Sequence, residues 1–325
     1  MTPTIHALLR YVHPSQKKQI SMKKLKVTIG IPAYNEEKNI AGFIKNLLKQ
    51  RTNLATVDKI IIVSDGSTDN TAAIVNKFKN HYIVLCERDK RKGKAARENE
   101  ILKMSSGDIT VLLDADIVIN DTKFLDKLIA PVVAGRAEMT SSAIQPLSPR
   151  TFFEKTFFVS TKLKEILYLQ FKNGDNVYTC YGPARAFARK FYKKLNFISS
   201  EGEDMFSYFS CLNLGYKFKN VPQALTYYRL PTNFADHCKQ STRYHYAKKH
   251  MNKYFDMKTV LAEQMIPLSI YTKAFIKALP VILKNPLCVV LYLLILAYTK
   301  TISENKYQKN DNWNVTTTKL VRGQL

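Results

Sequence analysis

The chain has 325 residues, enough for one large domain or two smaller ones with a substantial core. A hydrophobic fraction of 46% and a charged fraction of 23% exclude wholesale disorder, and five scattered cysteines without Cys-x-x-Cys spacing argue against a disulfide or zinc framework and favour a reducing compartment. The formal charge of +24 indicates an anionic partner: nucleic acid, a phosphate-bearing substrate or an anionic membrane surface.

The two ends of the chain are polar and basic. Residues 1–21 lack the short apolar stretch of a secretory signal, and Met22 looks like a natural start. We therefore expect a flexible leader over 1–21 and a basic polar tail over 300–325.

Short β-rich runs alternate with amphipathic stretches through the first half. This alternation predicts βαβ units and a mostly parallel sheet flanked by helices. The expected strands are 26–31, 59–63, 82–86, 109–114 and 138–144, with a late one at 224–228. The expected helices are 36–50, 69–80, 93–105, 121–134 and 151–172.

The last third changes character. Residues 265–280 are apolar with interleaved lysines, and 287–299 are almost entirely apolar. Thirteen residues of helix cover roughly 20 Å, whereas crossing a bilayer takes about 20 residues. Lysines flank the segment on both sides, which gives no positive-inside preference. We expect peripheral or monotopic attachment at the cytoplasmic face of a membrane; a buried core helix is the alternative.

An acidic pair, Asp114-Ala115-Asp116, ends the apolar run 109–113. Open α/β sheets bind ligands beyond the carboxyl ends of their strands, and paired carboxylates suit a hard divalent cation that also contacts substrate phosphates. A metal–diphosphate site is the first hypothesis. A strand-end Asp that only caps a turn is the simpler alternative.

Four other polar segments stand where predicted strands end or helices begin. Each alone could be a cap, a turn or a solvated charge run. Together, and in this order, they favour one shared site: Ile31–Glu37, Val63–Asp69, the cationic Arg88–Lys94 and the acidic Glu201–Asp204.

These segments carry the motifs IPAYNEE, SDGSTDNT, GKAARE, LLDAD and GED. In combination they resemble the family 2 glycosyltransferases, over residues 25 to about 245. The resemblance implies a GT-A fold, which is a Rossmann-like, mostly parallel α/β domain, at 22–235, followed by amphipathic or hydrophobic helices at 236–299. It also implies an inverting transfer from a nucleotide-diphospho-sugar to a hydroxyl group, assisted by Mg²⁺ or Mn²⁺.

The resemblance assigns two groups of donor-binding residues. The first would frame the nucleotide, with its last member on the nucleobase: Pro32, Tyr34, Glu36 and Asp65. The second would lie near the nucleotide and its phosphates: Lys94 and Arg97.

The remaining assignments concern the metal and the chemistry. Asp114 would face the ribose and the metal, and Asp116 would ligate the metal. Asp204 matches the family's general base, with Glu203 as its neighbour. The Tyr181–Ala184 segment would shape the sugar and acceptor pocket, although Gly182-Pro183 could be only a turn.

A later segment, Gln240-Ser241-Thr242-Arg243-Tyr244, resembles the Gln-x-x-Arg-Trp motif of membrane-embedded family members. Tyr244 replaces the expected Trp, which puts acceptor-side inferences in doubt. Gln240 would lie on the donor side, and Arg243 could pair with the departing diphosphate because guanidinium suits phosphate geometry. An ordinary exposed Arg on a helix is the alternative.

Several functional questions stay open. UDP-sugar is favoured as donor only by analogy, and the alternative is a GDP-mannose-dependent lipid-phosphate mannosyltransferase. A lipid-linked or glycan acceptor fits equally, and a polymerase would need a membrane protein partner because this chain has few apolar spans. A degenerate, inactive transferase is disfavoured because all the acidic positions are filled.

Other classes of protein fit less well. A sugar-phosphate nucleotidyltransferase would share the scaffold but normally has a Gly-rich phosphate loop, which 31–39 lacks. A nucleic-acid-binding module would explain the charge, yet the lysines are dispersed and no such motif appears, so we expect no nucleic acid partner. An oxidoreductase is disfavoured because no Gly-x-Gly-x-x-Gly follows the first strand.

Overall fold

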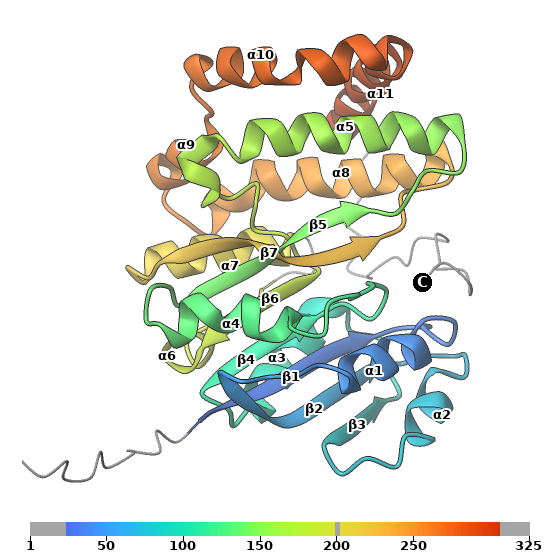
Figure 1. Cartoon of the computed structure of the whole chain (residues 1–325), viewed down its shortest axis with the longest axis vertical. Helices are drawn as coiled ribbons and strands as arrows, with labels where there is room; N and C mark the ends of the chain where they lie inside the picture. The colour runs from blue at the N-terminus through green and yellow to red at the C-terminus, as the bar shows by residue number, and fades with distance from the viewer. Residues whose placement is uncertain (1–23, 199–201, 306–325) are drawn as a thin grey trace, which may run out of the picture.

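A computed structural model describes residues 24–198 and 202–305; the expected leader, Glu201 and most of the expected tail lie outside these ranges. The described chain forms a seven-stranded sheet in the order β3-β2-β1-β4-β6-β5-β7 (Figure 1). β6 pairs antiparallel with β4 and β5, and every other pairing in the sheet is parallel. The predicted fold class, a mostly parallel α/β sheet flanked by helices, is confirmed.

The strands agree with the predicted ones, with one omission. β6 was not predicted, because its Ala-rich sequence lacks β-branched residues and reads as a loop. β7 is longer than expected. The strands are β1 (Leu25–Ala33), β2 (Ala55–Asp65), β3 (Ile83–Arg88), β4 (Ile109–Leu113), β5 (Met139–Pro146), β6 (Ala184–Ala188) and β7 (Phe218–Tyr228).

The helices in the first half are shorter than predicted, because the polar motifs form turns that precede them. They are α1 (Ile40–Leu48), α2 (Thr71–Asn76), α3 (Lys94–Met104), α4 (Phe124–Val133), α5 (Phe152–Tyr168), α6 (Arg189–Tyr192) and α7 (Glu203–Asn213). The later ones are α8 (Phe234–His250), α9 (Met257–Gln264), α10 (Leu268–Lys284) and α11 (Pro286–Asn305), with single 3₁₀ turns at Phe171–Gly174 and Met251–Lys253.

Alternate residues of the central strands supply two separate cores. On β2, Ile60 and Ile62 pack into a cluster with α1, α2 and α4, whereas Ile61 and Val63 pack into a second cluster with α3, α6 and α7. Successive side chains of a strand point to opposite faces, so helices on both faces require strands that are apolar throughout. The apolar runs of the sequence meet this requirement.

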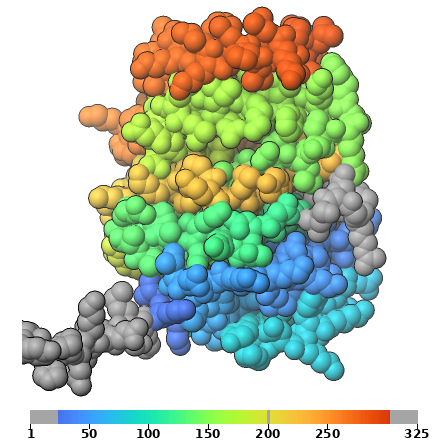
Figure 2. Space-filling model, viewed as in Figure 1, coloured from blue at the N-terminus to red at the C-terminus, as the bar shows by residue number. Residues whose placement is uncertain are grey.

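The helices after β7 extend the molecule beyond the β7 edge of the sheet. Ala247, Met251 and Val260, from the end of α8 through α9, belong to the second core, and Ile295 of α11 packs with Phe157 of α5. Figure 1 shows α5 and α8 stacked above β7 with α10 outermost, and Figure 2 shows the orange α10 region capping that end. The division into 22–235 and 236–299 stays a prediction; in the structure the two parts share a core.

The apolar C-terminal segments are helical. By length and composition, Met257–Lys284 could cross a membrane, and only 11% of its most apolar window is buried. The structure, however, interrupts it at residues 265–267, between α9 and α10. The predicted apolar segment 287–299 lies within α11. Composition therefore permits membrane contact at α10 and at α11, which have 17 and 20 residues.

Gly30 of β1 lies in close contact with Ile101 of α3. A Cβ atom at this position of β1 would overlap Ile101 Cγ2 and lie 3.0 Å from Leu112 Cδ2.

We predict that Gly30→Ala lowers the free energy of unfolding by about 1–3 kcal/mol, because the packed interface between α3 and the sheet must separate. Urea unfolding measures this. Gly42→Ala is the matched control: Gly42 is exposed in α1 with open space around it, and Ala should raise stability by up to ~1 kcal/mol. Equal stability of Gly30→Ala and wild type would contradict the packing.

Candidate active site

Three segments far apart in the sequence meet beyond the end of β4. The backbone N–H of Asp114 donates to the carbonyl oxygen of Pro183 at 2.9 Å, which ties the strand end to the loop before β6. In the same loop, a Cβ atom on Gly182 would lie 3.6 Å from Cβ of Asp204. The first acidic motif, the predicted pocket loop and the second acidic motif are therefore neighbours.

Lys94 joins the two acidic motifs directly. Its Nζ lies 2.7 Å from Asp114 Oδ1 and 2.7 Å from Glu203 Oε1, and its side chain is only 7% exposed. Burial by itself would lower the pKa of Lys94, but the carboxylates of Asp114 and Glu203 outweigh burial and hold that pKa above its usual value. Lys94 is thus a permanently charged ammonium between two carboxylates.

The adjacent acids at the start of α7 have different proton affinities. Burial would raise the pKa of Glu203, but Lys94, Arg185 and Arg243 lower it to about 2. Burial and the neighbouring Glu203 charge raise the pKa of Asp204 above its usual value. When environments separate two carboxylates in this way, the one with the higher pKa is the better proton acceptor. Asp204 is that residue.

Asp116 is exposed to solvent, although many protein atoms lie around its carboxylate. This crowding and the Asp114 charge raise the pKa of Asp116 to about 6, against the opposing charges of Lys94 and Arg243. The proximity of Asp114 and Asp116 costs electrostatic energy that a cation would relieve.

The donor set fits a metal bound partly by substrate. Within residues 24–198 and 202–305, no group of three or more His, Cys, Asp or Glu could form a metal cage. Asp114 and Asp116 supply the one or two carboxylates by which Mg²⁺ is commonly held beside substrate phosphates. With every group ionised, the site would carry two more negative than positive charges: Asp114, Asp116, Glu98, Glu203 and Asp204 against Lys94, Arg185 and Arg243. Burial raises the pKa of Glu98 to about 7, which lowers this excess near neutral pH.

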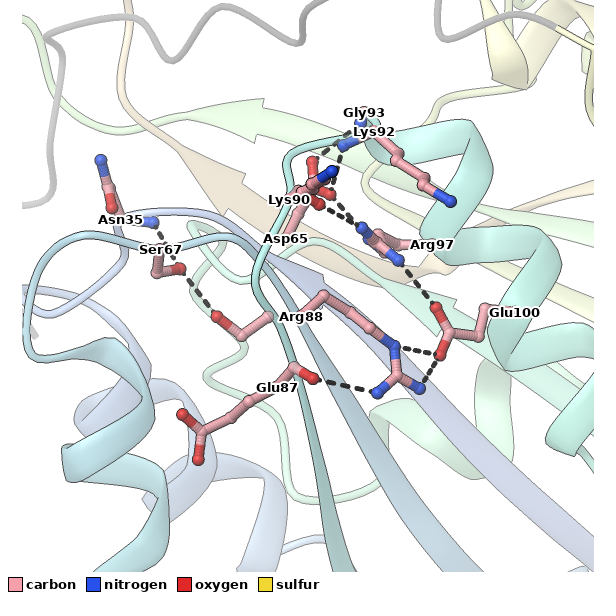
Figure 3. A network of polar contacts seen from close by, with 11 residues as sticks. Asn35, Asp65, Ser67, Glu87, Arg88, Lys90, Lys92, Gly93, Arg97 and Glu100 are labelled. Atoms are coloured by element: carbon pink, nitrogen blue, oxygen red, sulfur yellow. Dashed lines mark hydrogen bonds and ion pairs between the residues drawn. The ribbon is translucent and has the colours of Figure 1, made fainter.

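Asp65, the last residue of β2, binds the cationic segment Arg88–Lys94 through hydrogen bonds. Its Oδ1 accepts from the N–H of Lys92 at 2.8 Å and from Arg97 Nε at 2.6 Å, and its Oδ2 accepts from the N–H of Gly93 at 2.8 Å (Figure 3). Its side chain is fully buried. Asp65 therefore positions the start of α3, where Lys94 lies. Its predicted contact with a nucleobase stays a prediction, as does the predicted role of Arg97, whose guanidinium is bound to Asp65 and Glu100.

The IPAYNEE motif lies at the end of β1, beside the end of β2. Pro32 is buried. The backbone N–H of Glu36 donates to Thr71 Oγ1 at 2.7 Å, and its side-chain Oε2 accepts from the Asn39 amide at 2.7 Å, so Glu36 links the starts of α1 and α2 through its backbone and its side chain together. Tyr34 is half-buried, and the guanidinium of Arg91 lies 3.8 Å from its ring centroid. Of the predicted nucleotide-framing residues in this motif, Tyr34 is the one that presents a ring face to a neighbouring group.

Helix α8 brings a third polar segment to the acidic cluster. Arg243 is exposed and close enough to Asp116 and Glu203 to lower the pKa of both. Tyr244 is near enough to Asp204 for the carboxylate to contribute to its raised pKa, after burial and two other tyrosines. Gln240 is half-buried one turn earlier. The placement of Arg243 agrees with a diphosphate-binding role, which stays a prediction.

Sequence reasoning missed Glu98 and Arg185. Both are fully buried, with Arg185 Nη2 2.6 Å from Glu98 Oε1, and both interact with the Lys94–Glu203 group. The available signal was an arginine inside the small apolar run 184–188 and a glutamate one helical turn after Lys94. Neither reveals its partner in a single sequence.

The sheet order, the acidic pair beyond β4 and the second acidic motif at α7 define a GT-A type α/β domain. A sequence model described as "Glycosyl transferase family 2" matches residues 28–195, more than half of the chain, and the chain belongs to this family.

Three of the similar proteins illustrate these likenesses. The poly-beta-1,6-N-acetyl-D-glucosamine synthase of Staphylococcus aureus (strain COL) is 32% identical over 108 residues, which are 33% of this chain and 26% of that protein. The matched part is thus about a quarter of that relative's length. The Pyrobaculum calidifontis mannosyltransferase PcManGT, solved with GDP-Man and Mn²⁺, has a TM-score of 0.56 at 18% identity, over 88% of this chain and 77% of that one. The Mycobacterium tuberculosis glucosyl-3-phosphoglycerate synthase was solved with Mn²⁺, UDP and phosphoglyceric acid. It has a TM-score of 0.54 at 20% identity, over 75% of this chain and 80% of that one. The structural likenesses show the fold.

The Asp65 network predicts a large effect on stability. We expect Asp65→Asn to lower the free energy of unfolding by about 3 kcal/mol, because the buried Arg97 loses the buried one of its two anionic partners, Asp65 and Glu100. Urea unfolding measures the loss, and limited proteolysis should detect cleavage in the loop 88–93. Asp58→Asn is the control: Asp58 forms a long, partly exposed pair with Lys26 at 3.9 Å, and its loss should cost no more than about 1 kcal/mol. Equal costs for the two variants would contradict a supporting role for Asp65.

Proposed function

We propose that the chain transfers a sugar from a nucleotide-diphospho-sugar to a hydroxyl group, by a single displacement that inverts the anomeric carbon. The observation that carries the proposal is the buried ammonium of Lys94, which joins Asp114 of the first acidic motif to Glu203 of the second. Asp116 and Asp204 belong to the same two motifs, and the loop containing Gly182 and Pro183 lies beside both Asp114 and Asp204. The proposed metal ligands, Asp114 and Asp116, are thereby close to the proposed proton acceptor, Asp204. The family assignment supports the same reaction class.

Asp204 is the proposed base. The acceptor O–H proton passes to the Asp204 carboxylate while the acceptor oxygen forms a bond to the anomeric carbon. The bond from that carbon to the diphosphate oxygen breaks, and the nucleoside diphosphate leaves with the electron pair. The raised pKa of Asp204 favours proton uptake, and the low pKa of Glu203 keeps that neighbour charged as a partner of Lys94.

Asp116 and Asp114 are the proposed ligands of Mg²⁺ or Mn²⁺, which would neutralise charge on the departing diphosphate. Arg243 supplies a second positive charge on the same side, near Asp116. Lys94 keeps Asp114 oriented toward the site. Pro32, Tyr34, Glu36 and Asp65 belong to the strand ends where the nucleotide would lie, with Tyr34 offering a ring face to the base.

A UDP-sugar is the favoured donor, and GDP-mannose is the alternative. The two similar structures described above were solved with GDP-Man and with UDP, so both nucleotides occur among the structural neighbours. The Gln240–Tyr244 variant of the Gln-x-x-Arg-Trp motif supports the first, and the closeness of Arg243 to the acidic cluster is consistent with it. A nucleotidyltransferase would release pyrophosphate rather than a nucleoside diphosphate, so product analysis separates the two chemistries.

We further propose that the C-terminal helices attach the protein to an anionic membrane, and we place this attachment at the cytoplasmic face as part of the same proposal. Large apolar side chains of α10 and α11 are strongly exposed, among them Leu268, Leu283 and Leu287 at 73–78%. Lys273 and Lys277 are interleaved with them on α10. Apolar side chains flanked by lysines suit the boundary between headgroups and acyl chains. A lipid-linked or glycan acceptor at the membrane, and a membrane protein partner, follow as part of this proposal.

Replacing the base tests the reaction. We expect Asp204→Asn to reduce kcat by at least about 100-fold, because the amide cannot take the acceptor proton. Binding of the nucleoside diphosphate with Mn²⁺ should remain, as measured by calorimetry. Asp121→Asn, at an exposed acid paired with Lys127 on the surface, should keep wild-type turnover. Wild-type-like turnover in Asp204→Asn would remove Asp204 from its role.

Vesicle flotation tests the membrane proposal. The protein should float with vesicles containing about one third phosphatidylserine and much less with neutral phosphatidylcholine. Phe275→Ser with Ile276→Ser removes two exposed apolar groups from α10 and should abolish flotation, whereas Leu48→Ser, an exposed leucine on α1, should not. A protein that ignores both kinds of vesicle contradicts the proposal.

A further inference from the structure

A buried ion pair that no proposed reaction step uses connects α3, β6 and the start of α7. Arg185 of β6 and Glu98 of α3 are 0% and 1% exposed, with Arg185 Nη2 2.6 Å from Glu98 Oε1. The two residues are 87 positions apart in the sequence. Glu98 lies one helical turn after Lys94, so one face of α3 carries both Lys94 and the partner of Arg185.

The other terminal nitrogen of the guanidinium, Nη1, is hydrogen-bonded to the first turn of α7. Arg185 Nη1 donates to the carbonyl oxygen of Glu203 at 3.0 Å and to Ser207 Oγ at 3.1 Å. Ser207 Oγ in turn donates to the carbonyl oxygen of Asp204 at 2.7 Å. The backbone of both acidic residues is therefore attached, directly or through one hydroxyl, to Arg185.

The guanidinium itself has little freedom to move. In addition to its hydrogen bonds, the guanidinium contacts two aromatic rings. Its central carbon lies 5.8 Å from the ring centroid of Phe187 and 5.5 Å from that of Phe197. A planar, multiply bonded arginine between rings holds its partners in one geometry.

The pair is poorly explained by stability alone. Arg185 Nε and Glu98 Oε2 are buried and have no hydrogen-bond partner among the described protein atoms, so one strong bond joins the pair rather than two. Burying two charges has a desolvation cost that often equals their attraction, and apolar replacements of similar volume are often neutral or stabilising. The retention of such a pair therefore suggests that Arg185 must hold the groups bound to it in a fixed position.

We propose that Arg185, held by Glu98, is a positioning residue that sets the first turn of α7, and with it the Asp204 carboxylate, relative to Lys94 and Asp114. The inference rests on the proposed function in taking Asp204 as the base. It adds that α3 fixes both sides of the site: Lys94 contacts the metal-side acid, and Glu98 fixes the arginine that places the base. Small displacements of a reacting group have large kinetic effects.

The decisive variant is Glu98→Leu with Arg185→Met. It removes one negative and one positive charge, so the net charge at the site is unchanged, and the apolar pair should fold with a Tm close to wild type. We expect kcat to fall about 10–100-fold, while KM for the donor and Kd for the nucleoside diphosphate with Mn²⁺ stay within about twofold. Amide hydrogen exchange at residues 203–207 should accelerate. Arg185→Lys should also lose turnover, because one ammonium cannot reach Glu98 and both α7 oxygens.

The matched control is the buried pair of Glu154 and Arg229, 2.8 Å apart and 1% and 6% exposed, at the start of α5. Glu154→Leu with Arg229→Met should cost stability, because Glu154 also caps α5, but should preserve kcat and the exchange rates of 203–207. Wild-type kcat and exchange in the Glu98–Arg185 double variant would overturn the positioning role. A wild-type chain that neither transfers nor hydrolyses any sugar nucleotide would instead contradict the proposed function, and the exchange rates would then decide the positioning role alone.

Discussion

The buried ammonium of Lys94 is the interaction on which the site depends. Asp114 and Glu203 come from β4 and α7, and without a cation between them their charges would repel in a region shielded from water. Lys94 compensates both at 2.7 Å, and this lets two acidic segments approach closely. The consequence is chemical as well as structural. Glu203 is held ionised, and its charge, together with burial, raises the proton affinity of Asp204.

The topology explains how these segments meet. After β4 the chain builds α4, β5 and α5, and it then returns antiparallel as β6 between β4 and β5. The loop entering β6 reaches the carboxyl end of β4, where Pro183 accepts from the N–H of Asp114 and Gly182 leaves room for Asp204. The chain leaving β6 delivers α7 to the same place. A parallel strand at this position would begin beside the amino end of β4, away from Asp114.

The parallel part of the sheet could be predicted because its strands are apolar on both faces and are separated by helices of ordinary length. β6 could not, because an Ala-rich strand owes its place to neighbours rather than to its own propensity. The strand-end acids were recognised as a group, but one sequence does not tell which of them serve the site and which support the fold. The Asp65 carboxylate accepts from backbone N–H groups of the loop before α3, and the Glu36 carboxylate accepts from the Asn39 amide. The Glu98–Arg185 pair was out of reach, because nothing local couples residues 87 positions apart.

The most direct test of the central claim is a crystal structure with Mn²⁺ and a nucleoside diphosphate, in which anomalous scattering locates the metal. The account predicts manganese bound by Asp116 and Asp114, with Asp114 also still bound to Lys94 and the Asp204 carboxylate on the same side of the molecule as the metal. Manganese bound elsewhere, or Asp204 turned to a different surface from Asp116, would contradict it.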